Sequence, residues 1–221
     1  QFMKTQIEEK LAQGFSCIKL KIGAIDFDKE LGLLRFIRQN FDAKTIEIRV
    51  DANGAFNSNE ALSKLNQLNE FELHSIEQPI KANQIQEMKL LCHQTPFPIA
   101  LDEELIGVFE TEDKRKLLEE IQPQYIILKP SLVGGFKGTL EWISIAESLN
   151  IGWWITSALE SNIGLNAITQ FTFTLNNPMP QGLGTGGLYT NNFDCPLQIE
   201  NGHIQYNVDK QWGISNLGLQ L

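Results

Sequence analysis

The sequence lacks features that would place it in several large classes of protein. Its three cysteines, Cys17, Cys92 and Cys195, are far apart and form no C-x-x-C pair, so neither a disulfide framework nor a zinc site is indicated. No apolar run approaches the roughly 18 residues of a membrane span. The first residues, QFMKTQIEEK, contain no signal-peptide core. We therefore expect a cytoplasmic protein with no membrane partner.

Positive charge is also scarce. The 18 Lys and Arg residues are outnumbered by 27 Asp and Glu residues, and the formal net charge is −9. No basic cluster forms a stripe that could follow a phosphate backbone, so no nucleic-acid partner is expected. The length of 221 residues and the 42% hydrophobic content suit one large domain with a buried core.

Short apolar runs alternate with amphipathic stretches along most of the chain. The runs expected to form strands are CIKLKI, IEIRVD, LHSIE, PIALD, YIILK, IGWWITS and a weaker one near MPQGLG. Their last residues recur at intervals of 25 to 30 positions, at Lys21, Asp51, Glu77, Asp102, Lys129, Ser157 and Gly182. Repeated strand and helix units of ~30 residues predict an α/β fold of the TIM-barrel type.

The number of units predicts an incomplete barrel. Seven strands with a helix in first place are one strand short of a (β/α)8 barrel. The missing first strand would precede the helix expected around Ile7 to Leu11, so we interpret the chain as a fragment of a longer protein. We expect residues 1–195 to form the partial barrel and residues 196–221 to form a C-terminal tail.

Charged side chains occur at the ends of five successive predicted strands. Because side chains alternate between the two faces of a strand, several of them share the face opposite to the apolar residues that must meet the helices. These inward-facing residues include Lys19, Lys21, Asp51, Glu77, Asp102 and Lys129. The carboxyl ends of barrel strands form one mouth, where barrel enzymes have their active sites.

Three carboxylates at one mouth predict a metal site. Asp51, Glu77 and Asp102 would repel one another unless protonated or bound to a cation, and their oxygen ligands suit Mg²⁺. Any one of them alone is more often a helix cap or loop charge, but three at successive strand ends favour the metal. Asn53 is a substrate-binding candidate that could instead add a metal ligand or shape the turn before Gly54, and we favour the turn.

Two lysines complete the predicted site. Lys21 and Lys129 end strands that have three other strands between them, so they should face each other across the cavity with a substrate between them. A lysine near another cation in a dry site can have its pKa lowered enough to act as a base. The alternative is that each lysine pairs with a barrel carboxylate, which suits Lys19 better. Glu103 could pair with a lysine at the mouth, and Glu104 is expected in solvent.

The motifs KLK, VDAN, EQP, LDE and LKP follow one another at successive strand ends. In this order they resemble the enolase superfamily, in its muconate-lactonizing-enzyme-like branch, over nearly the whole chain. The resemblance implies that Asp51, Glu77 and Asp102 bind Mg²⁺, for which Mn²⁺ may substitute. It also implies that Lys21 is the acid/base and that Lys129 lies opposite.

The same resemblance implies a reaction and a domain organisation. Members abstract a proton beside the carboxylate of a small molecule, through a metal-stabilised ene-diolate. They also carry an N-terminal capping domain over the pocket, to which no segment of this chain corresponds. The tail, residues 196–221, would pack toward that domain. Oligomer formation is compatible with the sequence but is not specified by it.

Two further stretches bear on the reaction. The chain resembles the o-succinylbenzoate synthases in LKPSLVGG and in ITSALESNIG followed by QGLGTGGLY. These lyases of menaquinone biosynthesis remove water in a syn elimination from 2-succinyl-6-hydroxy-2,4-cyclohexadiene-1-carboxylate. GLGTG lacks the D-x-D usual in dipeptide epimerases. An N-acylamino acid racemase or dipeptide epimerase is the alternative function, and a non-catalytic barrel is the third.

Four small residues are added as substrate-binding candidates, beside Lys19 and Asn53. Ser157 and Ser161 offer hydroxyl groups, and the Gly134/Gly135 loop offers backbone N–H groups, to an anionic succinyl arm. A helix N-terminus beginning near Ser161 would favour the same anion. Ordinary helix capping and turn formation explain these residues equally well.

Overall fold

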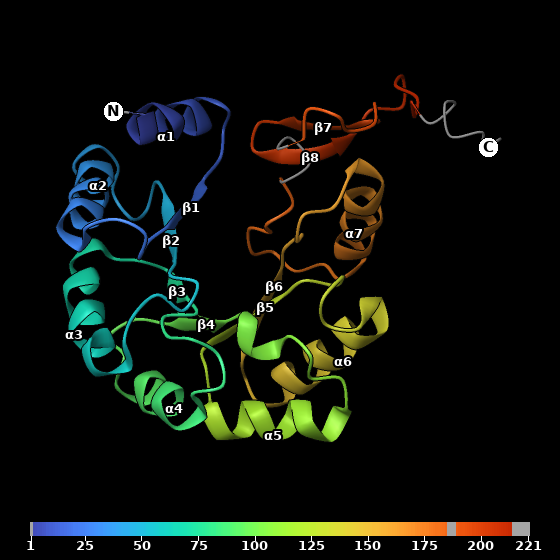
Figure 1. The fold of residues 1–221 in the computed structure, drawn as a ribbon. Helices are drawn as coiled ribbons and strands as arrows, with labels where there is room; N and C mark the ends of the chain where they lie inside the picture. Colours follow the sequence, from blue (N-terminus) through green and yellow to red (C-terminus); the bar gives the residue numbers. More distant parts are fainter. Residues whose placement is uncertain (1, 185–188, 214–221) are drawn as a thin grey trace.

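The computed structural model describes residues 2–184 and 189–213. Its main sheet has six parallel strands that pair in chain order from β1 to β6. They are β1 (Cys17–Lys21), β2 (Glu47–Asp51), β3 (Ser75–Glu77), β4 (Ile99–Leu101), β5 (Tyr125–Leu128) and β6 (Gly152–Ile155). The sheet curls into an open barrel with helices along its outer side (Figure 1). The predicted partial α/β barrel is confirmed.

Helices alternate with the strands, as the amphipathic stretches predicted. They are α1 (Phe2–Ala12), α2 (Phe27–Asn40), α3 (Ser58–Leu68), α4 (Ile85–Gln94), α5 (Thr111–Ile121), α6 (Gly135–Ser148) and α7 (Asn162–Thr174), with short 3-10 helices η1 (Asn69–Phe71) and η2 (Glu103–Leu105). Asn57 caps α3, because its side chain accepts a hydrogen bond from the Asn59 N–H at 3.0 Å.

The apolar face of the sheet packs against the helices. Val50, Ile76 and Leu128 point outward and are completely buried, in one core with helix residues such as Leu65 and Trp142. Burying one such side chain contributes about 1.5 to 3 kcal/mol. Because strand side chains alternate, this outward packing places the intervening residues of each strand on the inner face.

Below the strand ends, the inner face holds both apolar and charged side chains. Trp154 packs there with Ala100 and Ile127. The Arg49 guanidinium lies 4.1 Å from the centre of the Trp154 ring, and its Nε donates to Glu47 Oε1 at 2.7 Å. This cation–π and ion-pair contact fills the barrel floor.

The predicted seventh strand near MPQGLG does not form. Within the described part of the chain this segment joins the sheet through one bridge, between Thr156 and Gly182. Pro178 and Pro180 lack the backbone N–H that a strand ladder needs. A cavity of about 640 Å³ lies between this segment and residues 14–16 before β1. The prediction of seven strands is corrected to six strands and a bridge.

Part of the predicted tail folds into an antiparallel hairpin, which the sequence analysis missed. Its strands are β7 (Leu197–Glu200) and β8 (His203–Tyr206). Asn201 and Gly202 join them with φ of 50° and 73°, as the tightest hairpin turns require. A Cβ on Gly14 would come within 2.9 Å of Asn201, so the turn packs against the chain entering β1. Residues 214–221 of the predicted tail lie outside the described residues.

The helices of the structure are short compared with a membrane span. In the described ranges none has both the length and the apolar character to span a membrane.

Candidate active site

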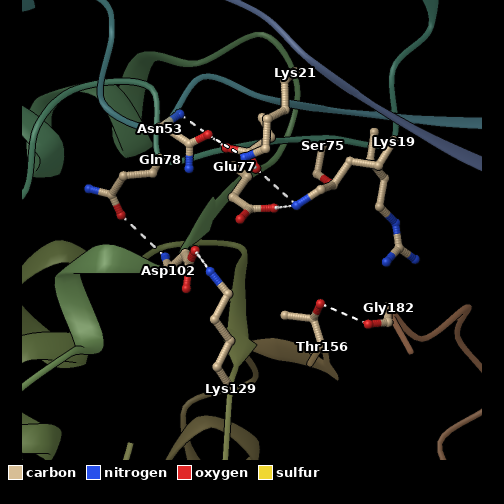
Figure 2. A network of polar contacts seen from close by, with 12 residues as sticks. Lys19, Lys21, Asn53, Ser75, Glu77, Gln78, Asp102, Lys129, Thr156 and Gly182 are labelled. Carbon is tan, nitrogen blue, oxygen red and sulfur yellow. Dashed lines mark hydrogen bonds and ion pairs between the residues drawn. The ribbon is translucent and has the colours of Figure 1, made fainter. Parts of the chain in front are cut away.

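The charged residues predicted at the strand ends converge at one end of the barrel (Figure 2). Neighbouring strands pair in a register that sets Lys21 beside Asp51, and Asp51 beside Glu77. Asp102 and Lys129 follow directly after β4 and β5. In Figure 2, Lys21 and Lys129 lie on opposite sides of the carboxylates. The predicted grouping at one mouth is confirmed.

Ion pairs join the lysines to the carboxylates. Lys19 Nζ lies 2.9 Å from Asp51 Oδ2 and 2.7 Å from Glu77 Oε2, so it bridges two strands. Lys21 Nζ lies 2.9 Å from the same Asp51 oxygen, and Lys129 pairs with Asp102. The alternative that the lysines pair with barrel carboxylates thus holds for all three in this structure.

The three carboxylates are buried, and burial controls their protonation. Glu77 has a side-chain exposure of 3%, and burial together with the negative charges of Asp51 and Asp102 raises its pKa to about 8, against the opposing effect of Lys19. Burial alone would raise the pKa of Asp51, but the ammonium groups of Lys19 and Lys21 outweigh it and lower that pKa. Lysines and carboxylates are equal in number at this mouth, and Glu77 is the carboxylate whose negative charge is least well compensated.

The Lys19–Glu77 pair shifts both partners upward for different reasons. Burial would lower the pKa of Lys19, but Glu77 and Asp51 raise it to about 12. Lys19 thus stays charged. The charged form of Glu77, by contrast, is stabilised by one lysine and destabilised by two neighbouring carboxylates. The raised pKa of Glu77 indicates a place where a cation is favourable, because buried carboxylates are crowded there.

The donor set can be tested for its fit to a divalent cation. Within the described ranges no three His, Cys, Asp or Glu side chains already form a metal-binding group. The lysines occupy one oxygen of each of the three carboxylates instead. Glu77 Oε1, however, is buried without a hydrogen-bond partner among the described residues. Oxygen donors and a buried carboxylate oxygen without a partner fit Mg²⁺, provided that these side chains turn from the ammonium groups toward the ion.

The comparisons with known proteins identify the family. A family model described as "Enolase C-terminal domain-like" matches residues 3–215. The chain belongs to this enolase C-terminal domain-like family. The resemblance seen in the strand-end motifs is therefore confirmed.

Individual relatives within the enolase group refine the comparison. An o-succinylbenzoate synthase of Desulfotalea psychrophila is 57% identical over 201 residues, which are 91% of this chain and 54% of that protein. The crystal structure of MenC from Desulfotalea psychrophila has a TM-score of 0.87 and 55% identity, covering 92% of this chain and 56% of that one. An N-succinylamino acid racemase of Thermus thermophilus is 34% identical over 72% of this chain and 40% of its own length. The chain spans about half the length of the curated relatives it matches.

Asn53 shapes the turn after β2 in this enolase-type barrel, as favoured from the sequence. Its φ of 43° is left-handed, and its N–H donates to Asp51 Oδ1 at 3.0 Å. Its side chain accepts from Lys21 and donates to Glu103 Oε1 at 2.8 Å. Asn53 therefore orients a predicted metal ligand and the predicted acid/base together. The expected pairing of Glu103 with a lysine is replaced by this contact with Asn53.

The expectation that Glu104 lies in solvent is wrong. Its residue exposure is 6%, and its carboxylate accepts from Gln78 Nε2 at 3.0 Å and from the Asn83 N–H at 2.8 Å. The 3-10 turn η2 directs Glu104 back into the protein after Asp102. Sequence reasoning missed Gln78, although it stands next to Glu77 in the EQP motif.

The serine candidates at the end of β6 differ in their positions. Ser157 is buried, and its Oγ donates to the Gly182 carbonyl at 3.3 Å. Thr156, which was not predicted, donates to the same carbonyl at 2.9 Å (Figure 2). Thr156 is two residues beyond the inward-facing Trp154, so strand alternation could have identified it. Ser161 precedes α7 as predicted and makes no capping hydrogen bond to the helix.

The glycine loop before α6 has mainly a backbone role. Gly134 and Gly135 have φ of 98° and 69°, which side-chain-bearing residues rarely adopt. The Gly135 N–H donates to the Pro130 carbonyl at 2.8 Å, so it is not available to an anionic substrate in this arrangement. Turn formation explains Gly135, and the predicted donor role remains open for Gly134 alone. Residues 185–188, part of the GLGTG comparison, lie outside the described residues.

Proposed function

We propose that the protein containing this chain is a Mg²⁺-dependent o-succinylbenzoate synthase. The observation that carries the proposal is the position of Lys21 and Lys129 on opposite sides of the buried carboxylates of Glu77 and Asp102 (Figure 2). The 57% identity to a protein of that name favours this reaction over others in the family. The substrate would be 2-succinyl-6-hydroxy-2,4-cyclohexadiene-1-carboxylate, and the products o-succinylbenzoate and water.

Lys21 suits the acid/base role because its side chain is 66% exposed, which lets it reach a substrate. As the free amine it takes the proton from the carbon beside the substrate carboxylate. It then gives that proton to the departing hydroxyl, so the C–H and C–O bonds break, a C=C bond forms and water leaves on the same face. Asn53 Oδ1 accepts from the Lys21 ammonium and holds it in place after the proton is taken.

Lys129 suits a charge role on the other face. Its side chain is 18% exposed and is paired with the buried Asp102. Asp51, Glu77 and Asp102 would hold Mg²⁺. When bound, this ion would place positive charge beside the substrate carboxylate, which favours the second negative charge formed there.

The wider setting belongs to the same proposal. We place the reaction in the cytoplasm and in menaquinone biosynthesis, following the o-succinylbenzoate synthase resemblance. Because the matched relatives are about twice as long as this chain, the proposed activity is that of the full-length protein, with barrel residues 1–195 and tail residues 196–221 working together with a capping domain.

A racemase is the second candidate, favoured by the likeness to an N-succinylamino acid racemase and by lysines on both faces. The test compares two rates in the full-length protein: dehydration, and solvent deuterium exchange at the reacting carbon of an N-succinylamino acid. We expect dehydration to be faster, because the identity to the o-succinylbenzoate synthase, 57%, exceeds the identity to the racemase, 34%. Faster exchange from both enantiomers than dehydration would contradict the dehydratase and support the racemase.

Replacing Lys129 with Arg distinguishes a charge role of this residue from a role as a base. Arg keeps a cation near Asp102 but does not give up its proton, so we expect dehydration to be retained at a reduced rate. Exchange from the enantiomer that needs a base on the Lys129 face should disappear. Lys129→Met is the comparison variant, since it removes the charge. Equal dehydration rates for the Arg and Met variants would argue against a charge role.

A further inference from the structure

Gln78 uses its whole side-chain amide in hydrogen bonds. Its Oε1 accepts from the backbone N–H of Asp102 at 3.2 Å and of Glu104 at 3.4 Å. Its Nε2 donates to the Ile80 carbonyl at 3.1 Å and to Glu104 Oε2 at 3.0 Å. A glutamine amide offers two acceptor and two donor positions, and all four are used here. The residue has an exposure of 0%.

The backbone of Gln78 joins further strand ends to the same point. Its N–H donates to the Ala100 carbonyl at 2.9 Å, and its carbonyl accepts from the Gly54 N–H at 2.7 Å. Gln78 therefore connects the ends of β2, β3 and β4. Its φ of 39° is left-handed and unfavourable for a side-chain-bearing residue, so these contacts must hold it. This unfavourable conformation occurs at the residue that directly follows the predicted ligand Glu77.

We propose that Gln78, together with Glu104, is a positioning residue that sets the relative placement of Glu77 and Asp102. Glu77 is the preceding residue, and Asp102 is held through its own backbone N–H. Glu104 extends the link by accepting the Asn83 N–H at 2.8 Å, which fixes the loop after β3. This inference rests on the proposed function, in which Glu77 and Asp102 bind Mg²⁺. Partners that orient ligands typically change metal affinity 10- to 100-fold when they are lost.

The amide of Gln78 cannot be replaced by its carboxylate isostere without loss. In Gln78→Glu, a carboxylate would face Glu104 Oε2 at the position where Nε2 now donates at 3.0 Å. Two such carboxylates repel and share a proton, which would displace the loop that carries Asp102. In the double variant Gln78→Glu/Glu104→Gln, the new amide at 104 can donate to the carboxylate at 78 and still accept the Asn83 N–H. The swap therefore restores the hydrogen bond between the two side chains, whereas the one to the Ile80 carbonyl stays lost.

The test measures Mg²⁺ affinity by calorimetry in the full-length protein, alongside the unfolding temperature without metal. For Gln78→Glu we expect Mg²⁺ affinity to fall about 10- to 100-fold. The double swap should return it to within about tenfold of the wild type and above either single variant, a coupling that independent sites do not show. Dehydration by Gln78→Glu should recover as Mg²⁺ is raised.

Gln124→Glu is the matched control. Gln124 also ties two elements with its amide, accepting from the Ile99 N–H at 2.9 Å and donating to the Cys92 carbonyl at 3.1 Å. It precedes β5, at the opposite end of the strands from Lys129. This variant should lower the unfolding temperature and leave Mg²⁺ affinity unchanged.

The outcomes separate this inference from the proposed function. Wild-type Mg²⁺ affinity in a folded Gln78→Glu protein, or additive effects in the double variant, would overturn the positioning role alone. If Gln78→Glu does not fold, Glu104→Gln decides in its place, because it removes the same bond from the outer side and should weaken Mg²⁺ binding. A wild-type protein that binds no Mg²⁺ would overturn the metal assignment and this inference with it.

Discussion

Lys21→Ala is expected to lower the dehydration rate by about 10⁴-fold, the upper end of what one acid/base group contributes. The reason is that Lys21 serves both the removal of the proton and the departure of the hydroxyl. The measurement is kcat for o-succinylbenzoate formation by the full-length protein at saturating Mg²⁺. Because the Lys21 side chain is 66% exposed, the variant should fold with little change in stability.

A lysine outside the barrel provides the control for this variant. Lys89 pairs with Glu120 at 2.8 Å between two outer helices, so Lys89→Ala should leave kcat unchanged. Exchange of the substrate proton with solvent should also stop in Lys21→Ala, because the neighbouring Lys19 lies between Glu77 and Asp51, which raise its pKa to about 12 and keep it protonated. A Lys21→Ala protein with more than about a tenth of wild-type kcat would show that another group is the base.

Glu77→Gln is expected to weaken Mg²⁺ binding by at least about 100-fold, because it removes a ligand and not merely a partner of a ligand. Calorimetric titration of the full-length protein with Mg²⁺ measures this change. The substitution keeps the size of a side chain that is 3% exposed, so the fold should be retained. Unchanged affinity would contradict the assignment of Glu77 as a ligand.

Glu77→Gln should weaken Mg²⁺ binding but raise the stability of the metal-free protein relative to the wild type as pH rises. The pKa of Glu77 is raised to about 8, so the folded protein favours the neutral acid more than the unfolded chain does. The wild type therefore loses stability as pH rises from about 4.5 to about 8, whereas a neutral glutamine does not. Glu77→Gln should gain relative stability over that range, measured by denaturant unfolding in a chelator.

Glu47→Gln is the control for both measurements. Glu47 also pairs with a cation, Arg49 at 2.7 Å, but it lies at the amino end of β2, whereas the predicted ligand Asp51 lies at the carboxyl end. Removing its charge should leave Mg²⁺ affinity unchanged and lower stability, because Arg49 has a side-chain exposure of 5% and would keep a buried charge with a weakened partner. Weakened Mg²⁺ binding in this variant would mean that any carboxylate in the barrel affects the metal.

Much of the fold and of the candidate site could be predicted from local patterns. Strand alternation has a period of two, so CIKLK already placed Lys19 and Lys21 opposite Ile18 and Leu20. The repeated spacing of strand and helix then brought the strand ends to one mouth. Local rules failed near MPQGLG, where the prolines outweighed the spacing and left only a bridge within the described residues.

The sequence by itself determined which residues face inward and at which end of the barrel they gather, because both depend on periodicity along one strand and on the direction of the chain. Only the tertiary structure decided which of them touch. Lys19 meets Glu77 across 58 positions of sequence, and Gln78 meets Glu104 across 26. Such pairs depend on the curvature of the sheet and on the turns after each strand. Glu104 is therefore buried, although its sequence neighbourhood is that of an exposed charge.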